Sequence, residues 1–113
     1  MKKIALFTGN RAEYGLQIPI LEATKNHPNL DYLLFVSGAH LDPKYGDTHK
    51  EIESDGYKIH EHINIGRGDT DLFSTSRTIS KGILEITKCI EKHSPDIFIV
   101  YGDRYESFAA AIS

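Results

Sequence analysis

The run Ile97-Phe98-Ile99-Val100-Tyr101 is apolar throughout and lies between Ser94-Pro95 and Gly102. A short, uninterrupted apolar run between turn residues is typical of a β-strand that is covered on both faces. Two earlier runs, Lys3 to Phe7 and Tyr32 to Val36, have the same character. Because strands buried on both faces occur mainly in parallel sheets, the sequence predicts a parallel sheet.

Helical patterns separate these strands. The first helix is predicted from Leu16 to Asn26, with Pro19 in its first turn, where proline is tolerated, and with His27-Pro28-Asn29 ending it. Its predicted apolar stripe consists of Leu16, Ile20, Ala23 and Leu21. A second, longer helix is predicted from Leu72 to Lys92, before Ser94-Pro95. Its apolar face is formed by Ile79, Ile83, Ile86 and Ile90.

The segment between these helices is less regular. Asp47 is expected to cap a short helix from Thr48 to Ser54, which Asp55-Gly56 closes. Alternation from Tyr57 to Ile65 predicts a third, more exposed strand. The last residues, Phe108-Ala109-Ala110-Ala111-Ile112-Ser113, read as the start of another helix.

The element order βαβαβαβ predicts an α/β fold with a three-layer, Rossmann-like parallel sheet. The 113 residues are enough for one hydrophobic core and too few for two domains. The last helix begins without an exit, so we expect residues 1–113 to be a truncated N-terminal Rossmann-like domain whose second domain is absent from this chain.

Composition excludes several classes of function. With 16 acidic and 13 Lys or Arg residues, the chain has a formal net charge of -3 and no basic footprint for nucleic acid. No apolar stretch approaches the roughly 20 residues of a membrane-spanning helix. The single cysteine, Cys89, fits a packed thiol in a reducing compartment, so a cytoplasmic location is expected.

In open α/β sheets ligands bind beyond the carboxyl ends of the strands, so the residues after each strand are candidate site residues. The first of these corners is Thr8-Gly9-Asn10-Arg11-Ala12-Glu13-Tyr14-Gly15. Its glycine suits a tight turn, the following helix N-terminus favours an anion, and Arg11 is suited to phosphate or carboxylate. The alternative is that Gly9 only makes the turn, while Arg11 and Glu13 are solvated.

The other corners carry His40, Arg67, Asp103 and Arg104. Asp103 suits a base or a group that orients a sugar hydroxyl, although Asp103 and Glu106 also have the spacing of a helix capping box. His40 suits ligand binding or proton transfer, but a loop histidine is more often only a surface residue. His60-Glu61-His62 places two imidazoles on one strand face without a third ligand, so no metal site is predicted.

Taken in order, three motifs resemble the hydrolysing UDP-N-acetylglucosamine 2-epimerases of sialic and legionaminic acid biosynthesis. They are Thr8 to Gly15, Ser37-Gly38-Ala39-His40-Leu41 with Lys44-Tyr45-Gly46-Asp47-Thr48, and Gly102-Asp103-Arg104. The resemblance runs essentially from Lys2 to Ser113. It implies the first half of a two-domain glycosyltransferase B type fold, so this part alone is expected to be inactive. It also suggests a homo-oligomer formed by the full-length enzyme.

The resemblance implies a UDP-sugar substrate, either UDP-N-acetylglucosamine or UDP-N,N'-diacetylbacillosamine. UDP is eliminated to give a glycal, to which water adds, and no cofactor is required. Arg11 and Arg104 would bind the diphosphate. Asp103 would be the catalytic acid/base, His40 would line the site, and Glu13 would support Arg11.

Departures from the reversible, non-hydrolysing branch favour the hydrolysing one. The non-hydrolysing branch typically has proline, lysine and threonine where this chain has Ala12, Leu16 and Arg104. Gly15 stands where some animal relatives have serine. The rival readings are a glycosyltransferase of the same fold and a free-standing flavodoxin-like or receiver-like module. Gly9-Asn10-Arg11 argues against both modules, since a receiver needs an acidic cluster there and a flavodoxin a longer, hydroxyl-rich loop.

Overall fold

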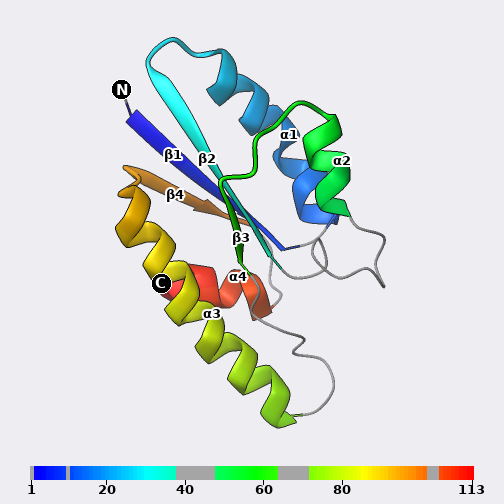
Figure 1. The fold of residues 1–113 in the computed structure, drawn as a ribbon, viewed down its shortest axis with the longest axis vertical. Helices are drawn as coiled ribbons and strands as arrows, with labels where there is room; N and C mark the ends of the chain where they lie inside the picture. The colour runs from blue at the N-terminus through cyan, green and yellow to red at the C-terminus, as the bar shows by residue number, and fades with distance from the viewer. Residues whose placement is uncertain (1, 10, 38–47, 64–71, 102–104) are drawn as a thin grey trace.

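The structure is a computed structural model that describes residues 2–9, 11–37, 48–63, 72–101 and 105–113 (Figure 1). Strands and helices alternate along the chain, as the sequence predicts. In order they are β1 (Lys2–Thr8), α1 (Arg11–Asn26), β2 (Leu30–Ser37), α2 (Thr48–Ser54), β3 (Glu61–Ile63), α3 (Leu72–His93), β4 (Ile97–Val100) and α4 (Tyr105–Ile112).

The four strands form one parallel sheet in the order β3-β2-β1-β4. Thr8 pairs with Val36 and Phe7 with Val100, so β1, like β2, is an interior strand with a neighbour on each side. This order is that of the first half of a Rossmann fold. The predicted α/β class with a parallel sheet is therefore confirmed.

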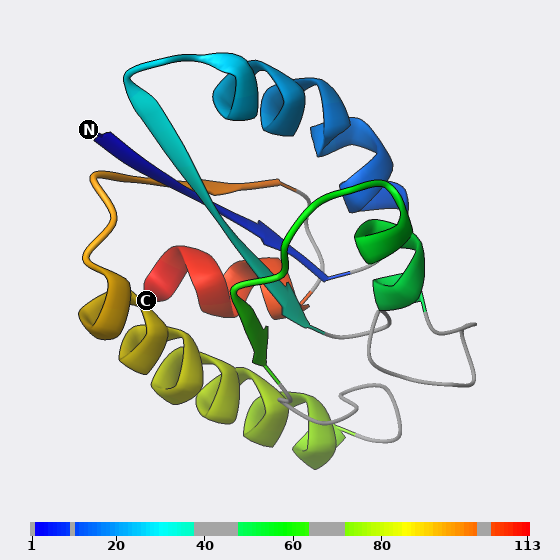
Figure 2. The ribbon, with the colours of Figure 1, turned by 45° about the horizontal axis from the view of Figure 1, so that its top comes forward.

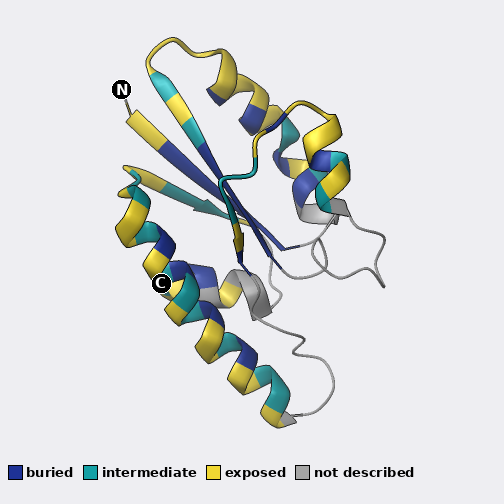
Figure 3. Cartoon of the chain, viewed as in Figure 1, coloured by how far each residue is buried: buried dark blue, intermediate teal, exposed yellow. Residues whose placement is uncertain are grey.

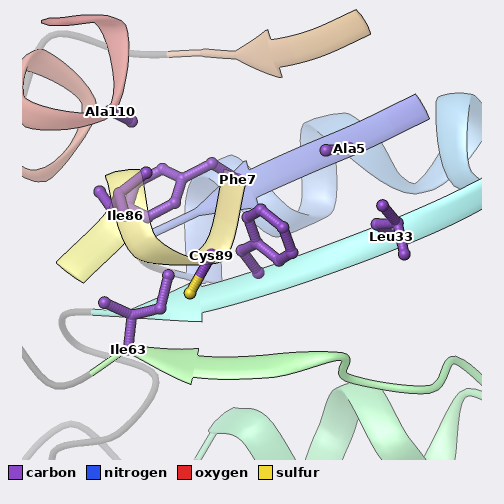
Figure 4. Close-up of a cluster of buried hydrophobic side chains, with 8 residues drawn as sticks. Ala5, Phe7, Leu33, Ile63, Ile86, Cys89 and Ala110 are labelled. Carbon is purple, nitrogen blue, oxygen red and sulfur yellow. The ribbon is translucent and has the colours of Figure 1, made fainter. Parts of the chain in front are cut away.

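Helices cover both faces of the sheet and make three layers, with α1 and α2 on one face and α3 and α4 on the other (Figures 1 and 2). Successive residues of β1 and β2 point to opposite faces of the sheet, and both strands are buried from their middle to their carboxyl ends (Figure 3). The cluster under α3 and α4 contains Ala5, Phe7, Leu33, Phe35, Ile63, Ile86, Cys89 and Ala110 (Figure 4). The cluster under α1 and α2 contains Ile4, Leu6, Tyr14, Leu21, Leu34, Val36, Ile52 and Tyr57.

The predicted stripe of α1 is wrong except at Leu21. The helix begins at Arg11, so Pro19 lies in its middle and not in its first turn. Leu16 is 58% exposed and Ile20 39% exposed, whereas Leu21 is fully buried. The face against the sheet is formed by Tyr14, Gln17, Leu21 and Thr24.

Two polar members conceal the buried face of α1 from a pattern based on hydrophobicity. The Gln17 Nε2 atom donates to the carbonyl oxygen of Phe7 at 2.9 Å, and Thr24 Oγ1 donates to the carbonyl oxygen of Ile20 at 2.8 Å. Each therefore enters the interior with a hydrogen-bond partner, which offsets the cost of burying it.

Strand β3 begins later than predicted: of the described residues 57–63, only Glu61 to Ile63 are in the sheet. In the residues before β3, side-chain atoms accept hydrogen bonds from backbone N–H groups where a longer strand would offer backbone carbonyls. The backbone N–H of Lys58 donates to the Tyr32 hydroxyl oxygen at 2.9 Å. The backbone N–H of Leu34 donates to Nδ1 of His60 at 3.1 Å.

The ends of α2 and α3 follow the sequence signals. After α2, Gly56 has a φ of 90°, the N–H of Tyr57 donates to the carbonyl oxygen of Ile52, and the N–H of Gly56 donates to that of Glu53. These bonds make a Schellman motif, which confirms the stop expected at Asp55-Gly56. After α3, Ser94 adopts a φ of 48° immediately before Pro95. Asp47, the expected cap of α2, lies outside the described residues.

The long helix α3 confirms its predicted face: Ile86 is fully buried, and Ile79, Ile83 and Ile90 pack against the same cluster. Cys89 on this helix is a free, buried thiol. Burial, with a smaller contribution from Glu61, raises the pKa of the Cys89 thiol to about 11. Among the described helices, none combines the length and the apolarity needed to cross a membrane.

Candidate functional site

The carboxyl ends of all four strands lie at one edge of the sheet. The register aligns Thr8 with Val36, Ser37 with Ile63 and Phe7 with Val100. Segments that follow strands in distant parts of the sequence therefore start side by side, as a ligand site of an open α/β sheet requires. The strand ends that precede the four predicted corners are thus brought together in the fold.

At the first corner, one residue outside the described set separates Gly9 from the start of α1 at Arg11. Arg11 and Glu13 are in the first turn of α1, so their backbone positions are those expected for a helix N-terminus at the ligand edge. Their side chains are outside what the structure describes. The roles assigned to them stay predictions.

The other predicted site residues, His40, Asp103 and Arg104, lie outside the described residues. Helix α4 begins at Tyr105, directly after Arg104. A carboxylate at position 103 therefore belongs to the short connection between β4 and α4, where both the catalytic and the capping role remain open. Arg67 also lies outside the described residues.

Gln17 and Ser37 are buried polar residues at this edge that the sequence analysis did not single out. Gln17 is 2% exposed and ties the second turn of α1 to the end of β1 through the carbonyl oxygen of Phe7. Its Oε1 atom and the fully buried Oγ of Ser37 have no hydrogen-bond partner within the described part of the chain. Unpaired buried oxygens are rare and destabilising, which makes these two positions candidates for contacts made only when a ligand or water is bound.

The signal for Gln17 was present in the sequence but was ambiguous. Gln17 is three residues after Tyr14 and four before Leu21, a spacing that shares one helix face with both. A pattern search that counts only apolar residues passes over it. Ser37 likewise ends an apolar strand, where it reads as the first residue of a turn.

Helix α1 is held to α2 by its tyrosine. The hydroxyl of Tyr14, which is almost fully buried, donates to Oδ2 of Asp55 at 2.5 Å. Burial and this bond raise the pKa of the Tyr14 hydroxyl above its ordinary value, so it remains a donor at physiological pH. Burial and a hydrogen bond to Glu22 likewise raise the pKa of Tyr57 to about 12. Both tyrosines are structural partners and not general bases.

The described residues contain no group of three His, Cys, Asp or Glu side chains placed to hold a metal ion. The two histidines of the His-Glu-His sequence have different neighbours. The His60 ring packs edge-on against Tyr32 at 5.4 Å between centroids. The His62 ring lies 6.0 Å from His49, and its Nε2 atom is 4.0 Å from Oε1 of Glu53.

Comparison with known proteins agrees with this fold. A family model described as UDP-N-acetylglucosamine 2-epimerase matches residues 22–113. A UDP-N,N'-diacetylbacillosamine 2-epimerase (hydrolyzing) from Legionella pneumophila is 34% identical over 113 residues, which are 100% of this chain and 30% of that protein. A UDP-N-acetylglucosamine 2-epimerase from Neisseria meningitidis is 32% identical over 98% of this chain and 29% of its own length.

Among solved structures, the UDP-GlcNAc 2-epimerase from Methanocaldococcus jannaschii superposes with a TM-score of 0.78 at 23% identity. The superposition covers 97% of this chain and 27% of that one, and it supports the fold. The chain thus spans about 30% of the length of the curated relatives it matches. The family model covers most of the chain, and the relatives match it almost from end to end; the chain belongs to the UDP-N-acetylglucosamine 2-epimerase family.

Proposed function

We propose that this chain is the first domain of a hydrolysing UDP-sugar 2-epimerase, which converts its substrate to the free 2-epimer sugar and UDP. The observation that carries this proposal is the 34% identity across all 113 residues with a relative whose name specifies the hydrolysing reaction. The residues Ala12, Leu16 and Arg104, where the non-hydrolysing branch has proline, lysine and threonine, support the same branch.

The chemistry of the reaction explains the residue types at the ligand edge. The C2 hydrogen of the sugar has no adjacent carbonyl and is only weakly acidic, so elimination of UDP to a glycal followed by addition of water is the easier route. That route needs positive charge at the departing diphosphate and a carboxylate that transfers protons at the ring. We assign the first task to Arg11 and Arg104 and the second to Asp103, with His40 lining the site and Glu13 fixing Arg11.

The fold supports the placement of Arg11. It begins a helix of 16 residues at the carboxyl edge of the sheet, and a helix N-terminus offers free N–H groups and a favourable dipole to an anion. A diphosphate there would meet both the backbone donors and the guanidinium group. Asp103 and Arg104 follow β4, the neighbour of β1 in the sheet, so the two ends of the proposed site start on adjacent strands.

Because the matched relatives are more than three times as long, we also propose that the active enzyme includes a second domain. We further propose that the full-length enzyme works as a cytoplasmic homo-oligomer. The 113-residue chain alone is then inactive, since an active site in a cleft between two domains needs residues from both domains. The two candidate substrates are UDP-N-acetylglucosamine and UDP-N,N'-diacetylbacillosamine, and turnover decides between them.

The test is proton NMR of the full-length polypeptide that carries these residues, incubated with each UDP-sugar in deuterium oxide. We expect free N-acetylmannosamine, or the corresponding 2-epimer of the diacetylated sugar, deuterated at C2 and released together with UDP. An epimerised sugar that is still attached to UDP would contradict the hydrolysing reaction. No turnover of either substrate would contradict the epimerase assignment and favour the glycosyltransferase.

Two variants test the assigned roles. Arg11→Ala should lower kcat/KM about 10- to 100-fold, because a hydrogen bond to a charged group contributes about 1.5–3 kcal/mol. Asp103→Asn should lower kcat by about 10² to 10⁴, the usual contribution of a positioned acid or base. Arg77→Ala, which removes an exposed arginine on α3, is the matched control and should leave both values unchanged.

A further inference from the structure

His60 is joined to the neighbouring strand by two hydrogen bonds to a single residue. Its backbone N–H donates to the carbonyl oxygen of Leu34 at 2.9 Å. The backbone N–H of Leu34 donates in return to Nδ1 of the His60 ring at 3.1 Å. The imidazole thus occupies the place that a backbone carbonyl would take if β3 extended one residue further towards its N-terminus.

This arrangement requires a neutral ring. A backbone N–H can only donate, so Nδ1 must present its lone pair, and the ring proton must be on Nε2. A doubly protonated ring would place one N–H donor against another and lose the bond. We propose that His60 is an acid-sensitive latch, which fastens the segment before β3 to β2 when its ring is neutral and releases it when the ring is protonated.

The groups around His60 disfavour its charged form. Lys58 on the same segment and His93 at the end of α3 are both cationic or able to become so, and His93 lies 6.4 Å from His60 between ring centroids. Asp31 on β2 and the adjacent Glu61 have the opposite effect. Burial is the largest cause, and the sum lowers the pKa of His60 below 6.5.

The sign of the pH effect follows. A histidine whose pKa is lower in the folded state than in the unfolded state contributes its full stability above the unfolded value of about 6.5. That contribution is lost as the pH falls towards and below the folded value. Between the unfolded and the folded pKa values, the equilibrium constant for opening rises up to tenfold for each unit by which the pH falls.

A second contact, between Glu61 and the end of α3, confines the opening to the segment before β3. Oε2 of Glu61 lies 2.9 Å from Nε2 of His93 and 3.0 Å from Nζ of Lys92. Burial raises the pKa of the Glu61 carboxyl, but the hydrogen bonds from His93 and Lys92 outweigh it and hold the pKa below 4.5, so the carboxylate is still charged when the pH first falls below 6.5. As the pH falls below about 6.5 the latch therefore weakens, while Glu61 still holds the start of β3 against α3.

The latch bears on the ligand edge because β3 has only three residues, pairs with β2 and leads directly into residues 64–71. That segment contains Asn64-Ile65-Gly66-Arg67-Gly68, one of the four corners of the candidate site. The proposal itself rests on the hydrogen bonds of His60 and does not depend on the epimerase reaction.

The test uses the full polypeptide and two NMR measurements across about pH 8 to 5. The ¹⁵N shifts of the His60 ring report its tautomer, and hydrogen exchange of the Leu34 amide reports whether the latch is closed. At pH 8 we expect an unprotonated Nδ1, a protonated Nε2 and a protected amide. On acidification the protection factor of Leu34 should fall as the His60 ring becomes protonated, by up to tenfold per pH unit.

Two variants at this position and one control sharpen the test. His60→Asn keeps an acceptor near the position of Nδ1 but cannot titrate, so Leu34 should stay protected at both pH values. His60→Phe removes the acceptor, so protection should be low at both. His62→Asn removes the exposed histidine two residues away and should retain the full pH response.

Three results would overturn the proposal. They are a protonated Nδ1 at pH 8, an acid-independent protection factor in the unmodified protein, and an unchanged pH response in His60→Asn. If either His60 variant fails to fold, the ring shifts and the Leu34 exchange of the unmodified protein decide the matter alone.

Discussion

The two faces of α1 can be distinguished by one pair of substitutions of the same residue type. Leu21 is fully buried against the sheet, and Leu16, five residues earlier on the same helix, is 58% exposed. The side-chain pattern alone placed both leucines on one apolar stripe, with Leu16 at its head. Leu21→Ala and Leu16→Ala therefore test which face of α1 packs against the sheet.

The expected magnitudes differ clearly. Leu→Ala removes three carbons, and at about 0.8 kcal/mol for each buried methylene the transfer contribution at Leu21 is about 2.4 kcal/mol. A partly unfilled cavity among its neighbours, which include Leu34 and Tyr57, raises the total towards the range of about 2.7–5 kcal/mol measured for such sites. At Leu16 we expect a change within about 0.5 kcal/mol of zero, because the side chain is mostly in water.

The assay is urea denaturation of the full polypeptide, followed by circular dichroism, with the free energy of unfolding compared at equal m-value. A loss of this size at Leu21 is a large fraction of the stability of about 5–15 kcal/mol that a domain has. Equal losses at the two positions, or a larger loss at Leu16, would refute the assignment of the buried face.

Three further outcomes follow from single contacts. Gln17→Glu places a carboxyl where an amide donates to the Phe7 carbonyl, so the acid must stay protonated to donate, and its pKa should be raised. Relative to the unmodified protein, this variant should then be most stable below about pH 4 and should lose stability as the pH rises, whereas the exposed Leu16→Glu should show no such trend in urea denaturation. Gly56→Ala meets no atom closer than the Lys25 Nζ at 3.9 Å, but its φ of 90° is unfavourable for alanine, so thermal denaturation should show a loss of about 1 kcal/mol. Cys89, with a pKa near 11 and little exposure, should resist a colourimetric thiol reagent at pH 8 and react once urea unfolds the chain; rapid labelling of the folded protein would contradict the burial described for it.

Much of the fold follows from the sequence because its central elements obey simple rules. The strands β1 and β2 contain the uninterrupted apolar runs Ile4 to Phe7 and Tyr32 to Val36, and α3 repeats isoleucine on one face over much of its length. Those signals depend on burial alone, and apolar residue types indicate directly which positions are buried. The ends of α2 and α3 were predictable for a similar reason, since Gly56 and Pro95 act through local backbone geometry.

The two errors have a common physical cause, which is hydrogen bonding between distant parts of the chain. Gln17 can lie on the buried face of α1 only because the Phe7 carbonyl accepts from it. The strand before Glu61 is replaced by side-chain contacts from Tyr32 and His60. No single-residue scale contains these partners. The candidate site was inferred from corner positions, and the fold brings the strand ends together, whereas the roles of Arg11 and Asp103 remain to be tested by activity.

The central position of β1 has a consequence for the protein during its synthesis. β1 is made first, but its neighbour β4 comes much later: Lys3 and Asp96, whose backbones meet beside the two strands, are 93 residues apart. At about 5–20 residues per second, the ribosome needs roughly 5 to 20 s to cover that distance. During this interval one side of β1 is an unpaired edge whose apolar residues Ile4 to Phe7 are available to other nascent chains. Aggregation during translation should therefore be most sensitive to changes that delay or delete β4, although β4 itself is only four residues long.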